Sequence, residues 1–231
     1  LSLSNLKISK TIDIKNCNNK HYRTIFGDGF LACWDILNSH NLPLLIGGDH
    51  SCAISSIFAS NEYCNMKKEK LGVLWFDAHT DFNTLQTSPT GNIHGVPVSV
   101  LCGHTLPFLA YGEYLDPSQF LYYGIRDIDT LEFLRFQQYN MNSIDHNSLI
   151  DFQLCELQKW MLKYDKIHLS FDMDCFDAND FDSVNTPVHN GPKKENIMAL
   201  IKIIKESKKL ISMDLVEYNP TINKNNTLII E

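Results

Sequence analysis

The sequence Leu71-Gly-Val-Leu-Trp-Phe76 is followed directly by Asp77-Ala-His79-Thr-Asp81. An apolar run of this length that ends in polar residues is typical of a parallel strand buried on both faces. A second run, Ile167-His-Leu-Ser-Phe171, leads in the same way into Asp172-Met-Asp174. Because ligands of open α/β sheets bind at the carboxyl ends of the strands, we expect both acidic segments at one edge of one sheet.

Further apolar runs alternate with helical patterns along the chain. Strands are predicted at 42–46, 120–124 and 210–215, and helices at 28–38, 51–59, within 147–163 and at 193–207. Such alternation favours parallel strands joined by right-handed crossovers. The predicted fold class is α/β, a three-layer α/β/α sandwich with a mainly parallel sheet. We expect a single domain over residues 1–231, with residues 1–20 forming a weak strand or a loop.

Composition narrows the class of protein. The chain has 231 residues and 44% hydrophobic content, enough for one α/β domain with a sizeable core. A net charge of −7 argues against a nucleic-acid surface. No apolar stretch approaches the roughly 20 residues of a membrane span, and the seven cysteines form no CxxC pair. These features predict a cytoplasmic protein with no nucleic-acid or membrane partner.

Carboxylates and imidazoles crowd the predicted sheet edge. Residues at i, i+2 and i+4 of an extended segment project to one side, so Asp77, His79 and Asp81 should converge, as should Asp172 and Asp174. Carboxylates this close resist ionisation unless cations are present. Two divalent ions would balance the four carboxylates, and imidazoles would complete the coordination. An oxygen-rich donor set with few imidazoles favours Mn²⁺ or a similarly hard ion.

Several motifs resemble those of the arginase/agmatinase (ureohydrolase) family. They include Gly47-Gly-Asp-His50-Ser, Asp77-Ala-His79-Thr-Asp81, Gly91-Asn-Ile-His94-Gly, Ser170-Phe-Asp172-Met-Asp174 and Glu217-Tyr-Asn-Pro220. The resemblance implies an arginase-like fold and two bound Mn²⁺ ions. It implies that one ion is held by His50, Asp77, Asp81 and Asp172, and the other by His79, Asp77, Asp172 and Asp174. In the family, a hydroxide between the metal ions attacks the guanidinium carbon, which yields urea and an amine.

The same resemblance implies catalytic and substrate-binding roles. Glu217 would pair with the guanidinium, His94 would carry a proton to the leaving amine, and Asp81 is counted as catalytic as well as metal-binding. The residues assigned to substrate binding, several of them where arginases recognise the α-carboxylate and α-amino groups of L-arginine, are Asn83, Thr90, Asn92, Asp129, Glu132, Thr186 and Glu217.

Two predictions concern residues next to the ligands. Asp49 is expected to orient His50, because metal-bound imidazoles usually need an acceptor for the second nitrogen. His168 lacks ligand-type neighbours in the sequence. We therefore expect a surface or satisfied core role for it.

Hydrolysis of L-arginine to L-ornithine and urea is the predicted reaction, and two other readings stay open. The same site could act on agmatine, guanidinobutyrate or formimidoylglutamate. Alternatively, the chain could be a catalytically degenerate module that binds metal or an amino acid, because the Ser183–Gly191 loop departs from the family pattern and the terminal family elements look short or missing. The resemblance also implies a homo-oligomer, either a trimer or a hexamer.

Overall fold

A computed structural model describes residues 21–222 and contains one six-stranded sheet in the order β1-β6-β5-β2-β3-β4. All neighbouring strands are parallel. The strands are β1 (Leu44–Ile46), β2 (Leu71–Phe76), β3 (Phe120–Tyr123), β4 (Asn142–Ile144), β5 (Lys166–Asp172) and β6 (Leu210–Val216). Because β2 and β5 are neighbours at the centre, the segments that follow them emerge side by side.

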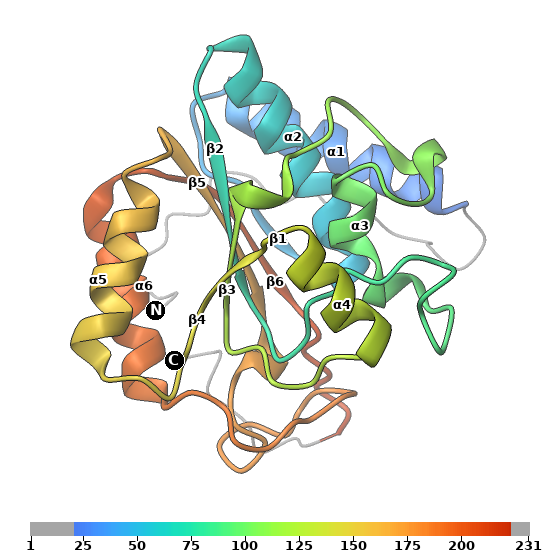
Figure 1. Cartoon of the computed structure of the whole chain (residues 1–231). Coiled ribbons are helices and arrows are strands. Elements are labelled where there is room, and N and C mark those ends of the chain that lie inside the picture. The colour runs from blue at the N-terminus through green and yellow to red at the C-terminus, as the bar shows by residue number, and fades with distance from the viewer. Residues whose placement is uncertain (1–20, 223–231) are drawn as a thin grey trace.

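Helices cover both faces of the sheet (Figure 1). One face carries α1 (Tyr22–Asn38), α2 (Ala53–Met66), α3 (Pro97–Leu101) and α4 (Thr130–Gln138), and the other carries α5 (Ile150–Met161) and α6 (Lys194–Ser207). Short 3-10 turns are η3 (His50–Cys52), η4 (Ile93–Gly95), η5 (Pro107–Leu109), η6 (Pro117–Gln119) and η7 (Met173–Cys175). The predicted α/β/α sandwich with a parallel sheet is confirmed.

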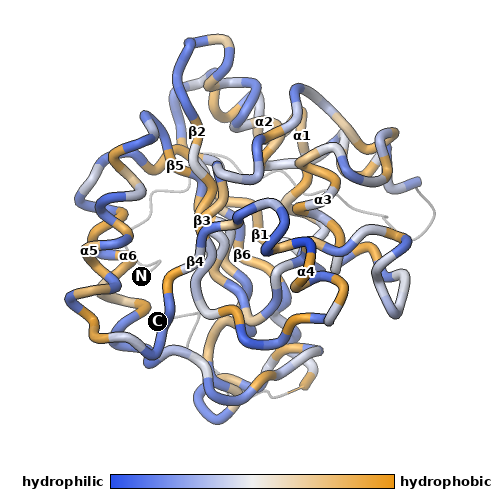
Figure 2. Tube along the Cα trace, in the orientation of Figure 1, coloured by the Kyte–Doolittle hydropathy of each residue, from blue (hydrophilic) through white to orange (hydrophobic). Residues whose placement is uncertain are grey.

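The central strand β2 faces two separate cores. Its residues Leu71, Val73 and Trp75 pack into the core on the α1–α4 side. The alternate residues Leu74 and Phe76 pack into the core under α5 and α6. Hydrophobic residues accordingly line the sheet and the inner sides of the helices in Figure 2. A strand buried on both faces explains why the sequence of β2 is continuously apolar.

Some boundaries and elements differ from the sequence prediction. The first helix begins at Tyr22, six residues before the predicted start, and the second extends to Met66. The sequence prediction contains no α3, α4 or β4. The elements α3 and β4 are too short to show a period, whereas α4 leaves Leu131 and Leu134 more than half exposed, which obscures its amphipathic pattern. Residues 1–20 lie outside the described part, so the prediction for them and the single-domain boundary stay predictions.

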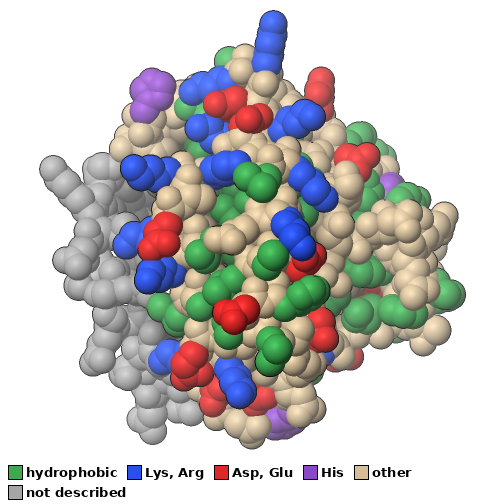
Figure 3. Space-filling model, turned by 60° about the vertical axis from the view of Figure 1, so that its left-hand side comes forward, with side chains coloured by type: hydrophobic (Ala, Val, Ile, Leu, Met, Phe, Trp, Pro, Cys, Tyr) green, Lys and Arg blue, Asp and Glu red, His purple; other side chains and the backbone are tan. Residues whose placement is uncertain are grey.

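The surface on the side of α5 and α6 is mixed in character. Hydrophobic, basic and acidic side chains are interspersed there, with lysine and arginine gathered in the upper half of the view in Figure 3. Across residues 21–222, every helix is too short or too polar to cross a bilayer.

Gly72 is predicted to be required by packing in the core under α5. A Cβ atom at this position would lie 2.6 Å from Trp160 and 2.7 Å from Tyr164. Overpacking of this kind typically costs about 1–3 kcal/mol. We expect Gly72→Ala to lower the free energy of unfolding by that amount, measured by urea denaturation. Gly95→Ala is the control, because a Cβ there would meet no atom within 4 Å. Equal stability of the two variants would contradict this account of the core.

Candidate metal centre

The predicted acidic residues gather at the carboxyl edge of the sheet. Phe76 of β2 pairs with Phe171 of β5. The next residue on each chain segment, Asp77 or Asp172, therefore lies beside the other at the same edge of the sheet. His50 begins η3 after β1, and Asp174 lies in η7 after β5. The end of β5 and the segments that follow β1, β2 and β5 thus supply the candidate ligands. All four aspartates of the set are buried, and Asp77 is completely so.

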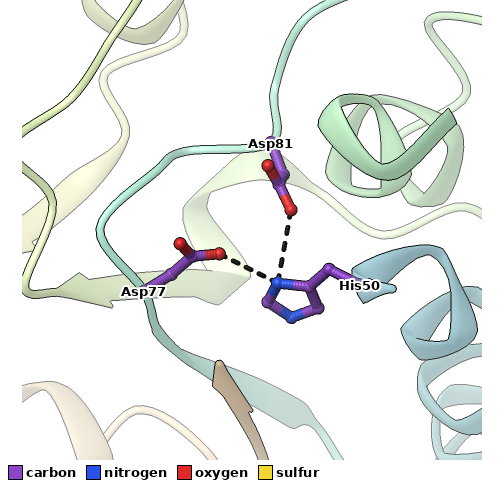
Figure 4. A group of neighbouring side chains, drawn as sticks. All are labelled: His50, Asp77 and Asp81. Atoms are coloured by element: carbon purple, nitrogen blue, oxygen red, sulfur yellow. Dashed lines mark ion pairs between the residues drawn. The ribbon is translucent and has the colours of Figure 1, made fainter. Parts of the chain in front are cut away.

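One group of candidate ligands surrounds the Nδ1 atom of His50. Carboxylate oxygens lie 2.9 Å (Asp77 Oδ2), 3.1 Å (Asp172 Oδ2) and 3.3 Å (Asp81 Oδ2) from this atom. Figure 4 shows His50 with Asp77 and Asp81 pointing toward one another. His50 is only 1% exposed, and within the described residues its Nδ1 atom has no hydrogen-bond partner. Donor atoms that converge without hydrogen bonding to one another are suited to sharing a cation.

A second group shares Asp77 with the first. His79 Nδ1 lies 3.3 Å from Asp77 Oδ1 and 3.2 Å from Asp174 Oδ2. Each group, His50 with Asp77 and Asp81 or His79 with Asp77 and Asp174, has donor atoms within 4.8 Å of one another. Because the two oxygens of Asp77 face different groups, this carboxylate is suited to bridge two ions.

The convergence has a different cause from the one predicted. The strand β2 ends at Phe76, and Asp81 adopts a left-handed backbone with φ 48°. The segment is therefore a turn rather than an extended strand, and the spacing argument was wrong in its reason. Hydrogen bonds hold the turn, from His79 N to Asp77 Oδ1 at 2.7 Å and from Tyr122 OH to Thr80 O at 2.9 Å.

The electrostatics of the cluster call for positive charge. Burial, followed by the charges of neighbouring carboxylates, raises the pKa of Asp81 and Asp172. Burial alone would lower the pKa of His50, but the close approach and negative charge of the Asp77 carboxylate outweigh it and raise that pKa to about 9. Hydrogen bonds to Asp174 and Asp77 likewise outweigh burial at His79 and raise its pKa to about 12. Protons on the imidazoles fill the role that divalent cations would fill, so the donor set fits a metal pair.

Neighbouring side chains orient His50. The Trp75 ring stacks on the imidazole with 4.0 Å between ring centroids, and its Nε1 donates to Asp77 Oδ2 at 2.9 Å. The second ring nitrogen of His50 lies 2.8 Å from Ser170 Oγ. Asp49 instead accepts a hydrogen bond from Ser51 N, so the prediction that it orients His50 was wrong. Trp75 and Ser170 each stand two residues before a ligand on a strand, a signal that sequence reasoning missed.

Arg126 ties together the loops beneath the second group. Its guanidinium donates to six backbone carbonyl groups, those of Gly124, Asp174, Cys175, Phe176, Val188 and His189. This clamp fixes the backbone around Asp174 against the 188–189 segment. The sequence analysis assigns no role to Arg126.

The residues predicted to move protons or bind the guanidinium lie beside the first group. Glu217 is buried and accepts a hydrogen bond from His50 N at 3.0 Å, and its backbone is left-handed with φ 61°. His94 Nδ1 lies 3.6 Å from Glu217 Oε1. The nearby Glu217 carboxylate raises the pKa of His94 above its ordinary value.

The other predicted substrate residues fall into distinct settings. Asn83 Nδ2 donates to Asp129 Oδ2 at 2.9 Å, which brings these two together. Glu132 is buried, and its carboxylate accepts from Phe82 N at 2.7 Å, so it is engaged in holding the loop after Asp81. Thr186 Oγ1 donates to Asp174 Oδ2 at 3.1 Å. Thr90 and Asn92 lie on the exposed loop before η4, where Asn92 N donates to Thr90 Oγ1.

Comparison with known proteins gives a consistent result. A family model described as "Arginase family" matches residues 3–230. Arginases of Entamoeba histolytica and Staphylococcus aureus (strain MRSA252) are 37% and 32% identical to this chain over 80% and 82% of its length. The chain covers 64% of the length of each of these relatives.

Solved structures show the same relationship. The structure of Entamoeba histolytica arginase in complex with L-ornithine matches with a TM-score of 0.83 and 32% identity, over 89% of this chain and 72% of that one. The native structure of arginase from Bacillus caldovelox matches with a TM-score of 0.84 and 27% identity, over 97% of this chain and 77% of that one.

Metal binding is predicted to release protons. The raised pKa values of His50 and His79 mean that both imidazoles carry an extra proton at pH 7, which a coordinating cation must displace. Affinity for Mn²⁺ should therefore rise with pH between 6 and 8. Calorimetric titration of chelator-treated protein in buffers of different ionisation enthalpy measures the proton count. Binding without proton release, or with affinity that falls as pH rises, would contradict the assignment.

Proposed function

The chain belongs to the arginase family, and from this membership we propose that it hydrolyses a guanidino group, with L-arginine as substrate and L-ornithine and urea as products. One observation carries the proposal. Three carboxylate oxygens surround the buried Nδ1 atom of His50 at short distance, and none of them makes a hydrogen bond to it. The ornithine complex of a relative with 32% identity supports the choice of amino acid.

We propose two Mn²⁺ ions as the cofactor. One would be held by His50, Asp77, Asp81 and Asp172, and the other by His79, Asp77, Asp172 and Asp174. A pair of divalent ions in such a site supplies a nucleophile from water at neutral pH. The two-sided placement of Asp77 between the groups supports this distribution.

Glu217 and His94 would act on the substrate. A carboxylate beside the metal centre pairs with a guanidinium through charge-assisted hydrogen bonds and so orients its carbon. His94 is partly exposed and close to that carboxylate, and its raised pKa favours the protonated form that can give a proton to the leaving amine. The deeper position of Glu217 and the more open position of His94 agree with this division of roles.

The amino-acid end of the substrate would be recognised by the loops after β2 and β3. The amide of Asn83 and the hydroxyl of Thr90 are donors that suit a carboxylate, whereas the Asp129 carboxylate suits an ammonium group. The hydrogen bond between Asn83 and Asp129 supports a shared site for these charges. Glu132 would act through the loop that it holds.

Finer aspects of the biology stay predictions from the family resemblance. They are the trimeric or hexameric assembly, the cytoplasmic location, and the identity of the ions as Mn²⁺. The whole protein's activity is likewise a proposal, because this chain spans 64% of the length of its curated relatives.

A substrate panel in the presence of Mn²⁺ tests the proposed reaction. We expect urea release from L-arginine at a higher kcat/KM than urea release from agmatine or guanidinobutyrate, or formamide release from formimidoylglutamate. Turnover of agmatine without turnover of L-arginine would instead identify agmatine, the decarboxylated compound, as the substrate. Two tight metal sites with no turnover of any guanidine would identify a binding module instead.

Glu217→Gln is expected to separate substrate binding from metal binding. The change keeps the side-chain shape but removes the charge, and charge-assisted hydrogen bonds are worth about 1.5–3 kcal/mol. We expect kcat/KM for L-arginine to fall by about 10–150-fold while Mn²⁺ affinity changes little. Steady-state urea assays and Mn²⁺ titration of the same preparation measure both. Unchanged kcat/KM would remove Glu217 from the substrate site.

Thr90→Val tests recognition of the carboxylate end. The substitution removes one exposed hydroxyl, and a hydrogen bond of this kind contributes about 1 kcal/mol. We expect a roughly fivefold loss of kcat/KM for L-arginine and no loss for agmatine, which has no carboxylate. Equal losses for both substrates would indicate a loop effect rather than recognition.

A further inference from the structure

A buried chain of polar groups leads away from the candidate metal centre between β5, β6 and α2. His168 and Ser170 lie on β5 opposite Ser212 and Asp214 of β6, and Ser60 of α2 packs over them. Each of these five side chains is completely buried. The chain starts at the ring of His50, whose Nε2 lies 2.8 Å from Ser170 Oγ. Polar groups that are buried away from water are tolerated only when each of them has a hydrogen-bond partner.

Consecutive members of the chain lie within hydrogen-bond distance. Asp214 Oδ2 is 3.0 Å from Ser170 Oγ and 2.9 Å from His168 Nε2. His168 Nδ1 is 2.7 Å from Ser212 Oγ, and Ser212 Oγ is 2.6 Å from Ser60 Oγ. The chain ends at the backbone carbonyl of Ser56, to which Ser60 donates at 2.7 Å.

Counting hydrogens from this end identifies the donor in each hydrogen bond between Ser60 and His168. A carbonyl oxygen only accepts, so the single hydroxyl hydrogen of Ser60 goes to Ser56 O. Ser212 must then donate its own hydrogen to Ser60 Oγ. The oxygen of Ser212 is consequently an acceptor toward His168, and the Nδ1 atom of His168 must carry a hydrogen.

The other nitrogen of His168 faces the carboxyl group of Asp214. Asp214 accepts from Ser56 through one oxygen and from Ser170 through the other. Asp214 Oδ2 also lies 2.9 Å from His168 Nε2, so these two atoms share one hydrogen. The pair thus joins the hydrogen-bond chain of Ser212 to Ser170.

The same count determines the state of His50. Ser170 gives its only hydrogen to Asp214, so its oxygen accepts the hydrogen of His50 Nε2. With Nε2 engaged by Ser170, the nitrogen of His50 that is directed at a cation is Nδ1, the atom that faces Asp77, Asp81 and Asp172. The tautomer that the metal centre requires is set from within the sheet.

We propose that His168 and Asp214 form a buried hydrogen-bonded pair that acts through Ser170 to hold the His50 ring with Nδ1 directed at the metal centre. His168 and Asp214 are positioning residues, because neither belongs to either ligand group. The part of this inference that concerns metal affinity rests on the proposed metal site. The part that concerns protonation stands on the hydrogen-bond chain alone.

Nuclear magnetic resonance of the metal-free full chain, labelled with ¹⁵N at histidine, tests where His168 carries its hydrogen. We expect the Nδ1 atom of His168 to show the shift of a nitrogen that carries a hydrogen, with the resonance assigned by its loss in His168→Asn. A bare Nδ1 would overturn the hydrogen-bond chain. This result is independent of substrate and of metal.

Mn²⁺ affinity, read from the electron paramagnetic resonance of the free ion, tests the positioning role. Removing groups that orient metal ligands typically weakens metal binding about 10–100-fold. We expect a loss in that range for Ser170→Ala and Asp214→Asn, and near wild-type affinity for Ser170→Thr, which restores the hydroxyl. Ser55→Ala is the matched control, since Ser55 is a buried serine of α2 outside the chain.

The outcomes are distinguishable. If Ser170→Ala is folded by circular dichroism and binds Mn²⁺ as tightly as the wild type, the positioning role is wrong. If the wild type itself binds no Mn²⁺, the proposed function fails, and the resonance measurement still decides the protonation of His168. An equal loss in Ser55→Ala would identify a general packing effect and would also overturn the role.

Discussion

Four buried carboxylates at the edge of one sheet are the constraint on which the rest of this structure depends. Asp77, Asp81, Asp172 and Asp174 lie where water cannot screen their charges. The surroundings compensate for this concentration of negative charge. Two imidazoles have pKa values raised far enough to carry protons in the absence of a cation, and backbone N–H groups and Trp75 donate to carboxylate oxygens. Arg126 restrains the backbone that follows Asp172 without pairing with the acids themselves.

The fold gives this centre a rigid base because its two cores are separate. The side chains of β2 alternate between the core under α1–α4 and the core under α5 and α6, whereas β5 contributes apolar side chains to the second core and the polar His168 and Ser170 to its other face. Ligands carried just beyond these strands are therefore anchored from both faces. The chain that links His50 to His168 occupies the face toward α2, so a buried polar region of the sheet lies directly behind the first ligand group. Packing and chemistry are thus divided between the two faces of the same strands.

Much of this arrangement could be predicted from the sequence, because apolar runs identify buried parallel strands and because the candidate ligands follow such runs. The sheet edge, the six candidate ligands and the place of Glu217 follow from that pattern and from the family motifs. Short or unusually exposed elements could not be found in this way, as α3, β4 and α4 illustrate. The turn at 77–81 was also hidden, since no residue in it is a glycine. The partner of His50 was missed for a different reason: hydrogen bonds across a sheet depend on register, and the polar spacing of His168, Ser170 and Asp172 becomes meaningful only when Ser212 and Asp214 lie opposite.

The left-handed backbone at Asp81 and Glu217 affects where the molecule begins to unfold. Each non-glycine residue held in this conformation stores roughly 1–3 kcal/mol, which the surrounding contacts must offset. Both residues lie on loops at the mouth of the centre, and both owe their setting to neighbours in it, so a loss of those neighbours releases the strain locally. The sheet below keeps its own contacts. Opening should therefore begin at the carboxyl edge of the sheet and spread inward, which makes the loops after β2 and β6 the first points of attack for a protease and the last to become ordered as the chain folds.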